Sequence, residues 1–112
     1  MRKLLIIAAA APRLTARQWC SISSTVTDSV FSGNTGTGLW FDQSCYGAEI
    51  IGNDIVRNSS HGLFYELSSH AVIADNLILD NGGNGMKINN SDALEIWNNT
   101  VVGNARQVNL VQ

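Results

Sequence analysis

The fold is decided by residues 50–58, IIGNDIVRN, which are followed closely by the segment GLFYE at residues 62–66. A similar pair of segments returns at residues 73–81 and 85–89, and the first of them returns again at residues 96–104. The asparagines that mark the pattern, Asn53, Asn76 and Asn99, are separated by 23 residues at each step. A fixed period of this length is the signature of a solenoid, in which each repeat is one structural unit stacked on the next.

Length and composition indicate one small domain with a buried core. The chain has 112 residues, of which 45% are apolar, and this length suits one domain rather than two. Charged residues make up 14% and the net charge is −2, so the chain lacks the clustered Lys/Arg surface that nucleic-acid binding requires. The longest apolar run, residues 4–11, is far too short to span a bilayer. We therefore expect neither a nucleic acid nor a membrane as partner.

The N-terminal segment, residues 1–23, does not carry the repeat, which we assign to residues 24–112. Residues 1–11 join a basic start to an apolar stretch, which indicates either a minimal secretory signal or a short capping helix. Residues 12–23 are interpreted as a linker or an end cap. Cys20 and Cys45 are either separate thiols or a bridge in an exported protein. The signal-like start is the reason to expect an extracellular or cell-surface location.

Each repeat contains three short segments in which apolar and polar residues alternate, and none is long enough for an amphipathic helix. Three strands and three turns per repeat predict a triangular coil, and stacked coils predict parallel sheets. A weaker first copy begins near Ser24 and the fourth copy lacks its glycine, so we predict an all-β solenoid of about four coils. The predicted interior consists of four ladders of stacked side chains: Val26/Ile50/Ile73/Ile96, Phe31/Ile55/Ile78/Val101, Leu39/Leu63/Met86 and Phe41/Tyr65/Ile88.

The repeated asparagines are predicted to lie in the turn between the first two strands of each coil. Asparagine tolerates the left-handed backbone of a sharp corner. Its amide both donates and accepts, so Asn53, Asn76 and Asn99 are expected to bond to one another from coil to coil. The glycines that open the third strand are expected where the chain has no room for a Cβ. They are Gly38, Gly62 and Gly85.

From residue 24 to residue 112, the spacing Asn-x-(Ile/Val)-x-x-Asn-x-x-x-Gly-(Leu/Met) resembles the coil repeat of right-handed parallel β-helix proteins of the pectate-lyase-like class, which share the pectin lyase fold. The resemblance implies a right-handed parallel β-helix that binds or processes carbohydrate, foremost acidic polysaccharide, on an outward sheet. It also implies more coils than the nearly four seen here, as in a fragment of a longer domain. It allows a Ca²⁺ ion, although we find no ligand motif for this or any other cofactor. A leucine-rich repeat is the rival fold, but Ser91 stands where that repeat requires a leucine.

Function in a solenoid depends on the side chains that point outward. Alternation along the third strand places two rows of side chains outside, and each row runs from coil to coil. The first row is Trp40, Phe64 and Lys87, and the second row is Asp42, Glu66 and Asn89. Carboxylates on neighbouring strands lie close enough to serve as an acid/base pair. The predicted catalytic residues are Asp42, Glu66 and Lys87, and the predicted substrate-binding residues are Trp40, Phe64 and Asn89.

Simpler interpretations remain open beside these. Asp42 and Glu66 can be an exposed acidic pair whose mutual repulsion is reduced by the positive charge of Lys87. His61 and His70 can be solvated turn residues. The resembling proteins include polysaccharide lyases, epimerases, glycoside hydrolases, phage tailspikes and adhesins, so the repeat does not assign an activity. Two functions of different classes therefore stand: a carbohydrate-active β-helix, and a non-catalytic surface or adhesion module. Open strand edges at both ends of the stack predict self-association.

Overall fold

The computed structural model describes residues 16–19, 25–42 and 45–112, with only the backbone described for residues 16–19. The signal-like residues 1–11 and Cys20 lie outside the described residues. Within the described part, every regular element is a β-strand. No helix in these ranges is long and apolar enough to cross a membrane.

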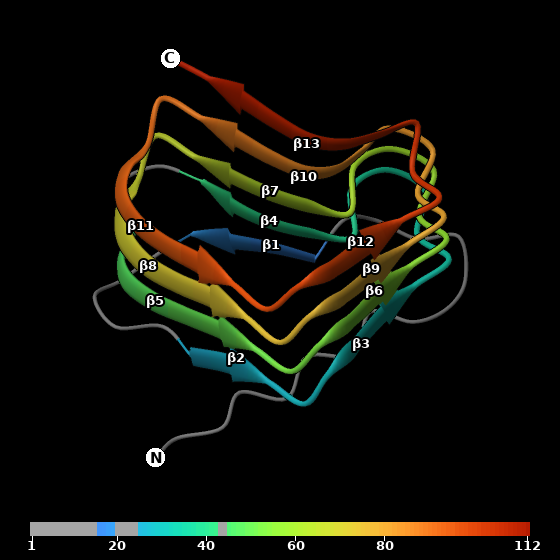
Figure 1. Cartoon of the computed structure of the whole chain (residues 1–112), viewed down its shortest axis with the longest axis horizontal. Coiled ribbons are helices and arrows are strands. Elements are labelled where there is room, and N and C mark those ends of the chain that lie inside the picture. The colour runs from blue at the N-terminus through green and yellow to red at the C-terminus, as the bar shows by residue number, and fades with distance from the viewer. Residues whose placement is uncertain (1–15, 20–24, 43–44) are drawn as a thin grey trace.

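The strands build three parallel sheets that form the three sides of a solenoid (Figure 1). The five-stranded sheet contains β1 (Ala16–Trp19), β4 (Leu39–Asp42), β7 (Leu63–Glu66), β10 (Asn84–Asn89) and β13 (Arg106–Val111). The β2 sheet contains β2 (Thr25–Thr27), β5 (Tyr46–Ile51), β8 (Ser69–Ala74) and β11 (Asp92–Trp97). The β3 sheet contains β3 (Val30–Ser32), β6 (Asp54–Val56), β9 (Leu77–Leu79) and β12 (Thr100–Val102). The predicted right-handed parallel β-helix of about four coils is confirmed, and the leucine-rich repeat is excluded.

The register of the strands confirms the predicted interior ladders. Val26 pairs with Ile50, Ile50 with Ile73, and Ile73 with Ile96. The other three ladders pair in the same way. Val26, Ile50 and Ile73 are completely buried, whereas Ile96 on the last coil is 40% exposed. Full burial of an aliphatic side chain stabilises a fold by about 1.5–3 kcal/mol, so the middle coils contribute more to stability than the last one.

The five-stranded sheet starts earlier in the chain than the repeat pattern indicates. β1 pairs in parallel with β4, from Ala16 opposite Leu39 to Trp19 opposite Asp42. The sheet therefore includes a strand that the asparagine and glycine spacing does not predict.

Cys45 is disulfide-bonded. This favours a bridge between the cysteines over two separate thiols.

Asparagine ladders run through two corners of the solenoid. At the first corner, the Oδ1 of Asn76 accepts hydrogen bonds from the backbone N–H and the Nδ2 of Asn53, both at 3.0 Å. The Nδ2 of Asn76 donates to the carbonyl of Ile50 and to the Oδ1 of Asn99, both at 2.9 Å. The second corner repeats this pattern. Its members are Asn34, Asn58, Asn81 and Asn104. Pairing offsets the desolvation cost of these buried amides, and the predicted asparagine ladder is confirmed.

The expectation that the asparagines themselves take the left-handed conformation is wrong. Positive φ falls on the residue before each ladder position, for example Asp75 at 56° and Asp80 at 55°. The asparagine side chain then turns inward to its neighbours, while the preceding residue makes the corner. The other residues with this conformation before a position of these two ladders are Asp28, Gly33, Gly52, Arg57, Asn98 and Gly103.

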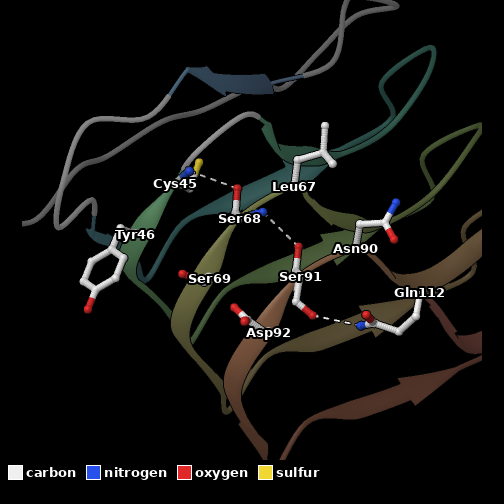
Figure 2. Close-up of a pocket in the computed structure, with 9 residues that line it drawn as sticks. All are labelled: Cys45, Tyr46, Leu67, Ser68, Ser69, Asn90, Ser91, Asp92 and Gln112. Carbon is white, nitrogen blue, oxygen red and sulfur yellow. Dashed lines mark hydrogen bonds between the residues drawn. The ribbon is translucent and has the colours of Figure 1, made fainter.

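The third corner carries a ladder that the sequence analysis did not predict. The Oγ of Ser68 accepts from the backbone N–H of Cys45 at 3.0 Å, and the Oγ of Ser91 accepts from the N–H of Ser68 at 3.1 Å (Figure 2).

The asparagine ladder of the second corner ends at Gln107. In the last coil, the Oε1 of Gln107 accepts from the N–H and the Nδ2 of Asn104. Gln107 thus supplies the acceptor that the next asparagine supplies in the lower coils.

The glycine that opens the third strand is required by close packing. A Cβ at Gly62 would lie 2.6 Å from the carbonyl oxygen of Gly85 and 2.8 Å from the Nδ2 of Asn81. Both distances are below van der Waals contact. The distance to Asn81 also shows that Gly62 faces the asparagine ladder of the second corner. The predicted need for a residue without a side chain is confirmed here.

Replacement of Asn76 by leucine should destabilise the protein strongly. Asn76→Leu removes the acceptor of two donors of the buried Asn53, its backbone N–H and its Nδ2. An unpaired buried polar group costs about 1–3 kcal/mol. We therefore expect the free energy of unfolding, measured by denaturant titration, to fall by about 2–6 kcal/mol.

Asn90→Leu is the matched control for this change. Asn90 is exposed, and Leu67 already occupies the equivalent corner position one coil earlier with the same left-handed backbone. The control should shift the free energy of unfolding by no more than about 0.5 kcal/mol. An Asn76→Leu protein as stable as Asn90→Leu would contradict the stabilising role of the ladder.

Candidate functional site

The five-stranded sheet brings the predicted site residues together in two outward rows. Trp40 pairs with Phe64, and Phe64 pairs with Lys87. Asp42 pairs with Glu66, and Glu66 pairs with Asn89. Both rows therefore lie on one sheet, with a step of 24 residues from β4 to β7 and of 23 residues from β7 to β10. We call the first row, Trp40, Phe64 and Lys87, the aromatic row.

The aromatic row is a column of stacked groups. The rings of Trp40 and Phe64 lie 5.3 Å apart between centroids, and their planes differ by 11°. The Nζ of Lys87 lies 5.2 Å from the centroid of the Phe64 ring. Contacts of these two kinds each stabilise by about 0.5–1.5 kcal/mol. Because Phe64 has a ring on one side and an ammonium group on the other, the row presents ring edges to solvent. A flat platform for a sugar face is therefore not formed at Phe64.

Glu66 is held in place from both sides. Its Oε1 accepts from the indole Nε1 of Trp40 at 3.1 Å, and its Oε2 accepts from the Nδ2 of Asn89 at 3.2 Å. The carboxylate is therefore oriented by two neutral donors from the coils before and after it. A group held in this way is well placed to accept a hydrogen bond from a ligand, since each carboxylate oxygen has a further lone pair.

Asp42 does not lie on the open surface as expected. It is only 6% exposed, whereas Glu66 is half-buried. Asp42 stands in the sheet between Trp19 of β1 and Glu66 of β7. The idea of two carboxylates open to the same ligand is therefore wrong for Asp42.

His61 is more than a solvated turn residue. It immediately precedes Gly62, and its Nδ1 accepts a hydrogen bond of 3.0 Å from the backbone N–H of Asn84. Its ring meets the Phe64 ring edge-on, at 5.4 Å between centroids. Burial, and second the positive charge of Lys87, lower the pKa of His61 below its usual value of 6.5. The sequence signal was a histidine just before the glycine strand, at a position taken by Thr37 and Asn84 in adjacent coils.

His70 and Trp97 both lie on the β2 sheet, and neither belongs to the aromatic row. His70 is exposed and stacks on Tyr46 at 4.5 Å between centroids, away from the aromatic row on the β2 sheet. Trp97 is 52% exposed at the end of β11. Its exposure follows from its place on the last coil, where no further strand pairs with β11 in the described part of the chain.

A recess of about 540 Å³ lies at the third corner (Figure 2). Ser68 and Ser91 lie along its middle, and Asn90 and Gln112 lie to one side of them, while Tyr46 lies on the other side. The two serine hydroxyls are engaged with backbone carbonyls of the preceding strand ends. The recess is therefore open and polar, but its central hydroxyls already serve the serine ladder.

The described residues offer no evident metal centre. In residues 25–42 and 45–112, no group of three or more His, Cys, Asp or Glu side chains is placed to hold a metal ion. Of the two soft sulfur side chains in these ranges, Cys45 is disulfide-bonded and Met86 is buried in the core. The side chains described here do not fit a site for a soft transition metal, and we derive no chemistry from one.

The fold resembles that of a known enzyme over nearly the whole chain. A solved structure of a mutant of the periplasmic alginate epimerase AlgG superposes with a TM-score of 0.74 at 16% sequence identity. The match covers 95% of this chain but 27% of the epimerase chain, so this chain spans about a quarter of that protein. At this identity the likeness shows the fold alone. No curated protein sequence matches the chain.

The sequence of this chain matches the sequence model of a known protein family. Residues 16–112 match the family described as periplasmic copper-binding protein (NosD). The match begins at β1 and runs through the coils to the last residue, so it includes both asparagine ladders and the aromatic row. The chain therefore belongs to the NosD family of β-helix proteins.

Proposed function

We propose that the five-stranded sheet binds acidic polysaccharide through Lys87, Asn89 and the aromatic row. The observation that carries the proposal is the convergence of an ammonium group, an oriented carboxylate and two aromatic ring edges on one outward face. Lys87 supplies the charge that a uronate carboxylate requires. Glu66 accepts from sugar hydroxyls, and the ring edges form an apolar wall beside them. The structural relative acts on alginate, a polymer of uronic acids, which is the same class of ligand.

We propose binding rather than turnover as the activity of this chain. Asp42 is buried, and both oxygens of Glu66 are engaged with Trp40 and Asn89. A general acid or base must reach the proton that it transfers, which these two carboxylates do poorly. Polysaccharide lyase, epimerase and glycoside hydrolase chemistry would require groups beyond this row. As the relatives described as NosD and AlgG are periplasmic, we also propose that the chain functions in the cell envelope.

Substitution of Lys87 should weaken binding of a short oligouronate. Loss of one charge-assisted hydrogen bond costs about 1.5–3 kcal/mol, so we expect Lys87→Ala to raise Kd by roughly tenfold or more. Trp40→Ala should also weaken binding, because Glu66 loses its Nε1 partner and Phe64 loses its stacking partner. Isothermal titration calorimetry measures both effects without depending on the fluorescence of the tryptophan that is removed.

Arg57→Asn is the control for net charge. Arg57 is an exposed cation at the corner between β6 and β7, with a left-handed backbone that asparagine accepts. It should leave Kd unchanged although it removes the same charge as Lys87→Ala. Two results would contradict the proposed site. The parent protein binds no oligouronate, or Arg57→Asn raises Kd as much as Lys87→Ala does.

The alternative, a non-catalytic display or adhesion module, is favoured by the exposed last coil. Val108 and Leu110 continue the buried ladders of the five-stranded sheet, yet they are 47% and 66% exposed. Unpaired edges with apolar side chains recruit other strands. We propose that chains associate through this end.

Sedimentation at increasing protein concentration measures this association. Leu110→Asn should shift the protein toward monomer, because it removes the most exposed apolar side chain of the last coil. Leu67→Asn is the control, since Leu67 is 48% exposed but lies at a corner where Asn90 stands in the next coil. A parent protein that stays monomeric at every concentration would overturn the proposal.

A further inference from the structure

We propose that His61 is a second anion-binding residue of the face formed by the aromatic row. In this proposal, the Nε2–H group of His61 donates a hydrogen bond to the carboxylate of an acidic sugar held by Lys87, and binding is therefore coupled to pH. The inference rests on the proposed function and goes beyond it, since it names a new ligand-binding residue and predicts a proton linkage.

His61 and Lys87 flank the same ring. Phe64 receives the edge of the His61 ring, with planes at 74° and centroids 5.4 Å apart, while the Lys87 Nζ lies 5.2 Å from the Phe64 centroid. Both side chains are partly exposed. The two groups thus both lie beside the Phe64 ring, and in the proposal one carboxylate accepts from both.

The hydrogen bond from Asn84 fixes which nitrogen of His61 carries the proton. A backbone N–H only donates, so the Nδ1 that accepts from Asn84 at 3.0 Å is unprotonated. In the neutral ring the proton then lies on Nε2. Among the hydrogen bonds of the described residues, none uses the Nε2 of His61. A ligand therefore meets an oriented donor at this position, not an acceptor.

The charges around His61 make its protonation sensitive to an anion. Lys87 on β10 lowers the pKa of His61, in addition to burial. The other charged residues on the packed strands are Asp42 on β4, Glu66 on β7 and Arg106 on β13. Of these, Arg106 pairs with Asn84. Glu66 is engaged with its two neutral partners, so Lys87 is the charge that a bound carboxylate would neutralise.

The direction of the linkage follows from these charges. The second proton of the ring goes to Nδ1, which then gives up the hydrogen bond from the N–H of Asn84. A bound carboxylate favours the positively charged imidazolium, so the pKa of His61 is higher in the complex than in the free protein. Affinity should therefore rise as the pH falls from neutral toward mildly acidic values, and it should level off below the pKa of the free protein. Each unit of difference between the two pKa values corresponds to about tenfold in affinity.

The test is calorimetric titration of a short oligouronate between about pH 7.5 and pH 5.5, around the ordinary histidine pKa. The parent should bind more tightly at the lower pH, whereas His61→Asn should show a flat profile. Asparagine fits the position, because Asn84 occupies it in the next coil, and its amide oxygen can replace Nδ1 as the acceptor. His70→Asn is the matched control, since His70 is exposed on another sheet with a left-handed backbone, and it should keep the parent profile.

The methyl ester of the same oligouronate separates charge from shape. The ester should bind weakly and without pH dependence to the parent, because it brings no negative charge to Lys87 and His61. The proposal is overturned if His61→Asn keeps the pH profile of the parent, or if the ester shows the same profile as the acid. If the parent binds oligouronate with no pH dependence, this inference fails while the proposed function stands. If the parent binds no oligouronate, both fail.

A second measurement tests His61 directly, whether or not the variant folds. Nitrogen chemical shifts of the histidine ring, recorded by NMR on the parent, should report a proton on Nε2 at neutral pH and a pKa below 6.5 in the free protein. Saturating oligouronate should raise that pKa. A proton on Nδ1, or a titration of His61 that the ligand does not move, would overturn the proposal.

Discussion

The structure depends on the hydrogen bond between asparagine side chains of successive coils. A buried primary amide must satisfy two donors and an acceptor, and neither water nor the core can do so. In this solenoid, each middle asparagine meets that requirement only with the coils before and after it, as Asn76 does with Asn53 and Asn99. A slip of one residue in any coil would break several of these bonds and would also turn apolar side chains outward. The ladders therefore fix the register as firmly as the apolar core does.

The fixed register determines what the outward face can be. Parallel strands in register place equivalent side chains above one another, so side chains of successive coils stack along the axis of the solenoid. Trp40, Phe64 and Lys87 become a column for this reason, and Glu66 receives one neighbour from each adjacent coil. The same geometry limits the column, since stacked rings offer edges rather than faces to a ligand. Polar groups at the margins of the column, Lys87 and His61 among them, then have the larger role in recognition.

Much of the fold could be predicted from the sequence because its repeat is regular. The spacing of Asn53, Asn76 and Asn99 sets the coil length, and alternation identifies which side chains face inward. The third corner was missed because Cys45, Ser68 and Ser91 are not one residue type, although each serves the same ladder. The conformation at the corners was assigned to the asparagines, since propensity does not show that the preceding residue bears the positive φ.

The candidate site was predicted in its register but less well in its exposure. Alternation correctly pairs Asp42 with Glu66, yet it gives only the face on which a side chain lies and not its exposure, and Asp42 is 6% exposed. The surroundings of His61 depend on a hydrogen bond to Asn84 across coils, which no local pattern reveals. The family assignment adds the periplasmic description but no ligand set, since the side chains present do not form a copper site in the described ranges.

The claim that asparagine ladders fix the register is tested most directly by hydrogen exchange of the side-chain amides. NMR of the parent protein resolves the Nδ2 protons of individual asparagines, and buried, bonded amides exchange only through opening of the structure. We predict that the Nδ2 protons of Asn53, Asn76 and Asn81 exchange as slowly as the backbone amides of the middle strands, and far more slowly than those of the exposed Asn90. Exchange of the ladder amides at the rate of Asn90 would contradict the account.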